Sequence, residues 1–240
     1  MSSIKIVAHR GLWAGDEELG VPAVQKNSAD AFRLATEHRF GIETDFRDLA
    51  GKVVISHNPP TVEAMTAEAF AELLTPGQVV FINVKADGLA NSLTDLAKHS
   101  ILGKCERYAF DMSVPDTLGY ISADFPILER VSEYENILNS ASVIKGVFPE
   151  RSGIWLDGFH SDWYSALELE GACGAFSRIA VVSPELHGRS HQHVWEMVKK
   201  SLMKHQQTDG DSTEFLLCTD KPFEARRYFN EFEVAVPKVL

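Results

Sequence analysis

The chain has 240 residues, of which 45% are hydrophobic and 24% are charged, and its formal net charge is −11 at pH 7. This composition is that of a globular protein with a sizeable core and excludes a disordered polymer, a collagen-like rod and a disulfide-stabilised miniprotein. The excess of acids argues against a broad basic surface for nucleic acid or anionic lipid. An anionic substrate would therefore need a few local cationic side chains or a bound metal.

Short β-branched segments alternate with segments of helical periodicity along the chain. The strands are predicted at residues 4–7, 41–46, 79–84, 108–112, 126–131, 154–156, 179–182 and 215–218. The helices are predicted at residues 28–39, 67–74, 89–99, 114–121, 134–144, 163–176, 193–203 and 223–229. Eight such units in 240 residues fit an α/β protein with a single (β/α)8 TIM barrel. A doubly wound sheet is the alternative. No repeat or linker marks a boundary, so we expect one domain over residues 1–240.

The alternation is interrupted after the second predicted strand. Two extended segments, residues 46–49 and 53–57, flank Ala50-Gly51. This pattern predicts a β-hairpin after strand two. A turn centred on Ala50-Gly51 would return His57 to the neighbourhood of Glu43, at the point where the chain leaves the barrel.

Polar residues gather at the carboxyl ends of the first three predicted strands, where TIM barrels carry their active sites. The first strand is followed by His9 and Arg10, the second contains Glu43 and Asp45, and the third ends with Asn83 and Lys85. A spacing of two places a pair on one face of a strand. Two inward carboxylates repel each other unless a cation lies between them, and a hard divalent ion would satisfy both. Histidine suits proton transfer to or from a reacting phosphate.

These residues also have structural interpretations. His9 could be a hydrogen-bonded core histidine, and Lys85 a solvated lysine. Glu43 and Asp45 could belong to an exposed strand face paired with nearby cations. We favour the functional interpretation of these residues because all of them are predicted at one rim of the barrel.

The three cysteines, Cys105, Cys173 and Cys218, are an odd number, lie far apart and form no CxxC pair. Each lies in or beside an apolar segment, which favours buried reduced thiols. The sequence has no apolar stretch long enough to cross a membrane and no signal-peptide pattern at its amino end. We therefore expect a cytoplasmic protein without integral membrane association.

Six short motifs, taken in order, give the chain a family resemblance. They are AHRG (8–11), KNS (26–28), GIETDFR (41–47), VVISHN (53–58) and INVK (82–85), together with the helix that carries Phe32 and Ala35. AFDMS (109–113) and CTDKP (218–222) are weaker matches. With these motifs the chain resembles the glycerophosphodiester phosphodiesterase family, within the phospholipase-C-like phosphodiesterase superfamily of TIM barrels. The motifs cover mainly the first third of the chain.

The resemblance implies a metal-dependent phosphodiesterase of lipid metabolism. Glu43, Asp45 and Asn83 would hold one divalent cation, Mg²⁺ or Ca²⁺. His9 and His57 would be the general acid and base. The substrate would be a small glycerophosphodiester or a related polyol or sugar phosphodiester, cleaved by a substrate hydroxyl or by water.

Further residues take substrate-binding or supporting roles under this resemblance. Arg10 and Lys85 would neutralise the phosphate oxygens. Asn27 would support the metal site, although it or the neighbouring serine also reads as a helix N-cap. After the seventh strand, Glu185 and Arg189 could bind a polar or phosphorylated group, or could pair with each other in solvent.

The sequence departs from the family at three acidic positions. The family has Glu where this chain has Asn83 and Lys26, and Asp where it has Asn58. Acids at later strand ends, such as Glu129, Asp157 or Glu185, could compensate. The exchanges motivate an alternative function, a catalytically attenuated barrel that binds phosphorylated polyols or glycans. A lyase with Lys85 as Schiff base is a third candidate, but it gives the two histidines no task.

Two further expectations concern the surroundings of the site. Only residues 59–66 join the hairpin to the next helix, where many family members insert a subdomain, so we expect an open cleft. His191 and His193, at the start of a predicted helix, are expected at the surface.

Overall fold

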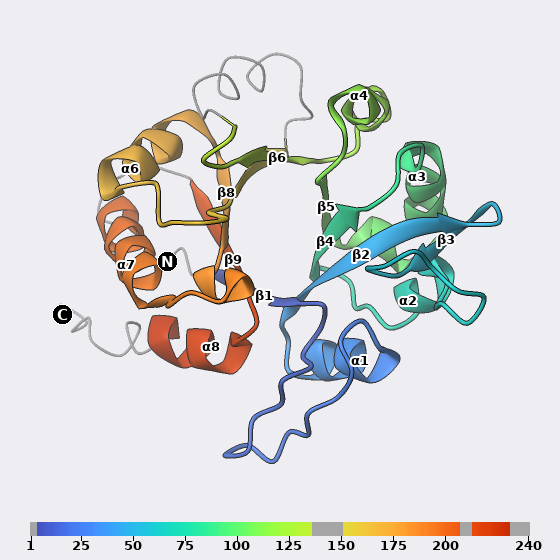
Figure 1. The fold of residues 1–240 in the computed structure, drawn as a ribbon, viewed down its shortest axis with the longest axis horizontal. Coiled ribbons are helices and arrows are strands. Elements are labelled where there is room, and N and C mark those ends of the chain that lie inside the picture. Colours follow the sequence, from blue (N-terminus) through green and yellow to red (C-terminus); the bar gives the residue numbers. More distant parts are fainter. Residues whose placement is uncertain (1–3, 136–150, 207–212, 231–240) are drawn as a thin grey trace, which may run out of the picture.

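The computed structural model of the protein describes residues 4–135, 151–206 and 213–230. Eight parallel strands form a nearly closed barrel in the order β5-β4-β2-β1-β9-β8-β7-β6 (Figure 1). The remaining seam, between β5 and β6, is bridged by a single parallel pair, Ala109 and Ile127. The strands are β1 (Lys5–His9), β2 (Gly41–Leu49), β4 (Val79–Val84), β5 (Glu106–Phe110), β6 (Leu128–Val131), β7 (Gly153–Leu156), β8 (Arg178–Val182) and β9 (Glu214–Thr219). The predicted TIM barrel is confirmed.

Helices surround the barrel and lie between successive strands (Figure 1). They are α1 (Ala29–Glu37), α2 (Ala67–Ala71), α3 (Ala90–His99), α4 (Val114–Ser122), α6 (Ala166–Ala175), α7 (Gln192–Gln206) and α8 (Pro222–Asn230), with 3₁₀ segments at Ile101–Lys104 and Pro184–His187. The predicted helix at 134–144 falls almost wholly outside the described residues. None of the helices in the described ranges combines the length and the apolar character needed to cross a membrane.

Hydroxyl side chains set the starts of several helices. Ser28, Ser113 and Ser165 each accept a hydrogen bond from a backbone N–H of the first helical turn. The carboxylate of Glu168 returns the bond to the backbone of Ser165, which completes a capping box at the start of α6. These caps satisfy N–H groups that have no partner within the helix.

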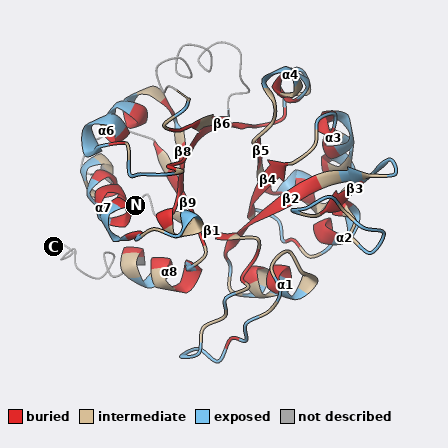
Figure 2. Ribbon diagram, viewed as in Figure 1, coloured by how far each residue is buried: buried red, intermediate tan, exposed pale blue. Residues whose placement is uncertain are grey.

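The core has two layers, one between the strands and the helices and one inside the barrel. The strands are almost entirely buried, whereas the helices bury only their inner faces (Figure 2). Inside the barrel, Phe81, Phe110 and Trp155 pack together, and the rings of Phe110 and Trp155 stack with their centroids 4.0 Å apart. These side chains fill the interior, so polar chemistry is confined to the rim. All three cysteines are buried, as predicted.

The predicted hairpin is present and extends from β2. The second strand runs three residues beyond its predicted end because it also forms the first arm of the hairpin. Its continuation pairs antiparallel with β3 (Lys52–Ile55), with Phe46 opposite Ile55 and Leu49 opposite Lys52. Ala50 and Gly51 both have positive φ, 50° and 80°, as a tight two-residue hairpin turn requires.

Candidate active site

The first and last strands of the barrel bring His9 and Asp220 together. β1 pairs with β9, His9 ends β1, and Asp220 directly follows β9. The Nδ1 atom of His9 lies 2.7 Å from Oδ1 of Asp220, which also accepts a hydrogen bond from Nε1–H of Trp13 at 3.1 Å. Burial opposes ionisation of Asp220, but the hydrogen bond and charge of His9 and the charge of Lys26 outweigh it and lower the pKa of this carboxyl. An ionised Asp220 fixes the proton of His9 on Nδ1 and leaves Nε2 facing the barrel mouth.

The two carboxylates of β2 are buried side by side at that mouth. Glu43 is 2% exposed and Asp45 is 1% exposed, which rules out the exposed-face interpretation. Oε2 of Glu43 accepts the backbone N–H of Arg10 at 3.0 Å and lies 3.8 Å from Nε2 of His9. Burial nevertheless raises the pKa of Glu43, and the neighbouring charge of Asp45 adds to this.

Asp45 has more compensating partners than Glu43. It accepts hydrogen bonds from Nδ2 of Asn27 at 2.9 Å and from Nδ1 of His57 at 3.1 Å. Nε of Arg10 and Nζ of Lys85 lie 3.4 and 3.7 Å from its oxygens. Burial opposes ionisation, but the bonds from Asn27 and His57 and the two cations lower the pKa of Asp45. The pKa values of the two adjacent carboxylates are therefore shifted in opposite directions, upward for Glu43 and downward for Asp45.

The hairpin returns His57 to the rim, as predicted from the position of its turn. The backbone N–H of Ser56 donates to the carbonyl of Asp45 at 2.9 Å. Arg47 fixes the end of the hairpin by donating to the carbonyls of His57 and Lys85 at 3.0–3.1 Å. The imidazole of His57 then contacts Asp45, while His9 lies beside Glu43. The two histidines thus flank the carboxylate pair.

Left-handed backbone conformations concentrate at this rim. Among the described non-glycine residues, six have positive φ, and three of them are Arg10, Asn27 and Asp111, at 56°, 56° and 65°. Such conformations are unfavourable for residues with a Cβ and cluster at functional sites. At Gly11, φ is 81° and a side chain cannot be added without strain, because a Cβ there would lie 2.8 Å from the Cβ of Ala31. This close approach of α1 sets the position of the loop that carries Arg10.

On the far side of Asp45, the third and fourth barrel strands add Asn83, Lys85 and Asp111. Asn83 is the register partner of Asp45 on β4, and its Oδ1 is buried without a hydrogen-bond partner. Nζ of Lys85 lies between Asp45 and Asp111, 3.7 and 3.8 Å from their nearest oxygens. Burial raises the pKa of Asp111, although Arg130, 3.2 Å away, opposes the shift.

The residues present fit a hard divalent cation. Glu43, Asp45 and Asn83 supply oxygen atoms, the donors that Mg²⁺ and Ca²⁺ prefer. The unpartnered, buried Oδ1 of Asn83 is an acceptor that such an ion would satisfy. Within the described ranges, no group of three or more His, Cys, Asp or Glu side chains is arranged to hold a metal. A metal here would therefore have two carboxylates and one amide as its protein donors.

Glu185 and Arg189 follow β8 at the same carboxyl end of the barrel, and their polar atoms are bound to other protein groups. Glu185 accepts hydrogen bonds from the hydroxyls of Ser183 and Thr219 and from the backbone N–H of Asp220. Arg189 pairs with Asp162 and the carbonyl of Gly158. The alternative of a solvent pair between Glu185 and Arg189 is therefore excluded, because each has nearer partners, and the alternative of ligand binding stays a prediction.

The surface prediction for His191 is also wrong. Its side chain is buried, its ring centroid lies 4.0 Å from that of Trp195, and Nε2 lies 3.1 Å from Glu224 of α8. The packing of α8 against the start of α7 covers it, and a single sequence does not specify that contact.

Glu133 ties the segment after β6 to the segment after β7. Its carboxylate accepts backbone N–H groups of Phe159, His160 and Ser161 at 2.9–3.0 Å. Burial opposes ionisation, but these hydrogen bonds lower the pKa of Glu133 to about 2.

Sequence reasoning gave no role to two acids of the site, Asp111 and Asp220. Each directly follows a barrel strand, and each lies in one of the weaker motifs, AFDMS and CTDKP. Their position after a strand was the available signal. The contact of Asp220 with His9 spans 211 residues and depends on barrel closure.

Comparisons with known proteins agree with this architecture. No protein-family model and no curated protein matches the sequence. A putative glycerophosphodiester phosphodiesterase from Galdieria sulphuraria superposes with a TM-score of 0.67 at 18% identity, over 96% of this chain and 100% of the other. A glycerophosphodiester phosphodiesterase from Agrobacterium tumefaciens str. C58 gives 0.56 at 18% identity, over 91% and 97%. The chain is a (β/α)8 barrel with a polar, carboxylate-lined mouth. More particularly, it shares the fold of these two structures, so the resemblance seen in the motifs is confirmed at the level of the fold.

Proposed function

We propose that this protein is a phosphoric diester hydrolase that uses His9 and His57 as its acid and base. The observation that carries the proposal is the placement of the two imidazoles on either side of the buried pair Glu43 and Asp45, with Asp220 behind His9. The shared fold supports it. Two groups that transfer protons on opposite sides of a phosphate are what cleavage of a diester requires.

In this mechanism His9 acts first as base. Its Nε2 accepts the proton of the attacking hydroxyl, from the substrate or from water, while a new P–O bond forms. Asp220 stabilises the imidazolium that results. His57 donates a proton to the leaving alcohol oxygen as the original P–O bond breaks. If the attacking group belongs to the substrate, the product is a cyclic phosphate, which water opens in a second step with the two histidines exchanging roles.

The cations at the rim would bind the phosphate. Arg10 and Lys85 flank Asp45 and are placed to neutralise the charge that grows on the phosphoryl oxygens. Glu43, Asp45 and Asn83 would hold a Mg²⁺ or Ca²⁺ ion, which supplies Lewis-acid stabilisation of that charge when bound. Asn27 orients Asp45 through its side-chain amide and is itself held by the hydroxyl of Thr44 at 2.8 Å.

We infer a small glycerol or other polyol phosphodiester as the substrate. The connection between the hairpin and α2 is only residues 56–66, so no inserted subdomain covers this side of the rim. Glu185 and Arg189 would act on the alcohol part of the substrate only if it displaced their present partners. A cytoplasmic location and the lack of a nucleic-acid partner stay predictions from the thiols and the net charge.

A second candidate, binding of phosphorylated polyols without turnover, draws on two observations. Asn83 supplies an amide where the family has a carboxylate. In addition, Nη2 of Arg10 lies 3.0 Å from Nδ1 of His57, so a cation already occupies part of the space beside Asp45. Both features weaken the attraction of the site for a metal.

Hydrolysis assays separate the two candidates. The purified protein is incubated with bis(p-nitrophenyl) phosphate and a panel of glycerophosphodiesters, with Mg²⁺, Ca²⁺ or EDTA. If the protein is a hydrolase, we expect turnover that is sensitive to the chelator and that falls by about 10²–10⁴-fold in His9→Ala and in His57→Ala. His99→Ala, at an exposed position on α3, is the matched control. Binding of glycerol phosphate with no turnover of any diester would overturn the hydrolase and support the binding protein.

A further inference from the structure

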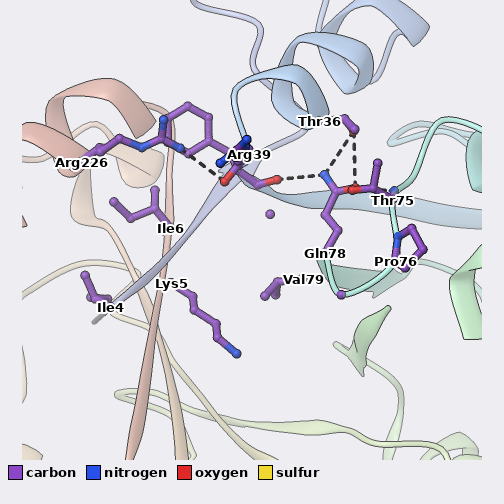
Figure 3. Close-up of a pocket in the computed structure, with 13 residues that line it drawn as sticks. Ile4, Lys5, Ile6, Thr36, Arg39, Thr75, Pro76, Gln78, Val79 and Arg226 are labelled. Atoms are coloured by element: carbon purple, nitrogen blue, oxygen red, sulfur yellow. Dashed lines mark hydrogen bonds between the residues drawn. The ribbon is translucent and has the colours of Figure 1, made fainter. Parts of the chain in front are cut away.

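A pocket lies at the opposite end of the barrel from the candidate active site. It has a volume of about 520 Å³ and opens at the amino ends of β1, β2 and β4, between the carboxyl end of α1 and α8 (Figure 3). Its wall includes the apolar side chains of Ile4, Ile6, Phe40 and Val79. The pocket is thus large enough for a small organic molecule, and one of its sides is apolar.

The charged residues of this pocket are all cationic. They are Lys5, Arg39 and Arg226, and no acid lines the pocket. Lys5 is neutralised by Glu106 and Glu214, at 2.6 and 2.5 Å. Neither arginine forms an ion pair with an acid of the described residues. In a chain of net charge −11, two arginines without acidic partners are a local concentration of positive charge in this pocket.

Arg226 is held rigidly at the pocket wall. Its guanidinium lies over the ring of Phe40, 3.7 Å from the centroid, and Nη2 donates to the carbonyls of His38 and Arg39 at 2.6 and 3.3 Å. These bonds satisfy carbonyls at the carboxyl end of α1, and Figure 3 shows the one to Arg39. Burial and the charge of the neighbouring Arg39 both lower the pKa of Arg226.

Arg39 occupies a backbone position that favours glycine. It follows the C-cap of α1 with φ 57°, and the N–H of Phe40 returns to the carbonyl of Ala35 at 2.8 Å, as in a Schellman motif. An arginine here carries conformational strain and adds a second cation to a helix end that Arg226 already serves. Helix capping therefore explains Arg226 but not Arg39.

We propose that Arg39 and Arg226 bind a phosphomonoester of a small organic alcohol at the amino end of the barrel. A phosphate group would accept hydrogen bonds from the free guanidinium N–H groups of both arginines and relieve their repulsion. The apolar wall would contact the organic part of the ligand. The site is separate from the candidate active site and does not depend on the proposed function.

Titration of protein labelled with ¹⁵N-arginine tests the site directly. The probes are phenyl phosphate and inorganic phosphate, and the readouts are the side-chain Nε–H resonances of Arg39 and Arg226. The resonance of Arg10 reports separately on binding at the active site. We expect the two pocket resonances to shift together on titration, with phenyl phosphate binding at least about tenfold more tightly than inorganic phosphate.

Substitutions complete the test. Arg39→Gln should raise the dissociation constant for phenyl phosphate at the pocket at least about tenfold, the loss expected for one charge-assisted contact. Arg33→Gln, which removes an exposed arginine of the same helix that pairs with Asp30, is the control and should leave it unchanged. Arg226→Lys keeps the positive charge while removing the planar donor set, and should weaken binding as well.

The results are decisive in either direction. Equal affinity for the two probes would confine the ligand to free phosphate and overturn the phosphomonoester assignment. Pocket resonances that do not move with millimolar probe, or an Arg39→Gln variant that binds as Arg33→Gln does, would overturn the site itself.

Discussion

Replacing Asp220 by asparagine would test whether the last strand orients His9. Asparagine keeps the shape of the side chain and an acceptor oxygen, but removes the charge that faces Nδ1 of His9 at 2.7 Å. A hydrogen bond to a charged group contributes about 1.5–3 kcal/mol, which corresponds to about a ten- to 150-fold change in rate. The partly exposed pair with Lys26, at 3.6 Å, adds little. We therefore expect kcat/KM for a phosphodiester to fall about ten- to 150-fold in Asp220→Asn.

The assay is hydrolysis of bis(p-nitrophenyl) phosphate, with circular dichroism to establish that the variant is folded. Asp95→Asn is the matched control, because Asp95 also pairs with a histidine, His99, but on the exposed face of α3. The ¹⁵N shifts of the His9 ring supply a readout that a purely structural role would not move, since they report which nitrogen carries the proton. A folded Asp220→Asn variant as active as Asp95→Asn, with the His9 tautomer unchanged, would refute the reasoning.

Three further predictions concern the metal, the packing and the pH dependence. Asn83→Asp should bind Mg²⁺ or Ca²⁺ about tenfold more tightly by calorimetry and be less stable than wild type in EDTA, because it adds a carboxylate beside an existing one; Asn91→Asp, on the surface, should do neither. Gly11→Ala should lower the free energy of unfolding in urea by about 1–3 kcal/mol more than Gly20→Ala, since both positions have positive φ but only the first lacks space for a Cβ. Because its folded-state pKa is lowered to about 2, Glu133 stabilises the protein above its unfolded pKa near 4.3 and loses this effect as pH falls toward 2. The stability difference between wild type and Glu133→Gln should therefore be constant at neutral pH and shrink between roughly pH 5 and 2, and a difference that grew on acidification would contradict the assignment.

The local sequence predicted the bounds of helices, strands and turns well where a single local interaction determines them. The strand at residues 79–84 was predicted with its observed bounds, because β4 is buried on both faces and all its residues except Asn83 are apolar. The start of α1 was predicted at Ser28, which caps it. Ala50-Gly51 located the hairpin turn, and with it the return of His57.

Contacts between distant parts of the chain could not be predicted in the same way. The role of Asp220 depends on β9 lying beside β1, and the burial of His191 depends on how α8 packs on α7. Glu185 has the residue type of a substrate ligand, but its oxygens are bound by Ser183 and Thr219. Spacing along a strand places Glu43 and Asp45 on one face, but which of the two carboxylates is better compensated follows only from the three-dimensional positions of Arg10, Asn27 and Lys85.

The site consists of two parts that are synthesised at different times. The stretch that contains Glu43, Asp45 and His57 is continuous in the chain, so a nascent polypeptide could assemble it early. The partner of His9, in contrast, leaves the ribosome about 160 residues later, roughly ten seconds at ordinary translation rates. If the proposed hydrolase activity is present, it should consequently appear only after the final strand has docked, and turnover of a phosphodiester would then report completed folding directly.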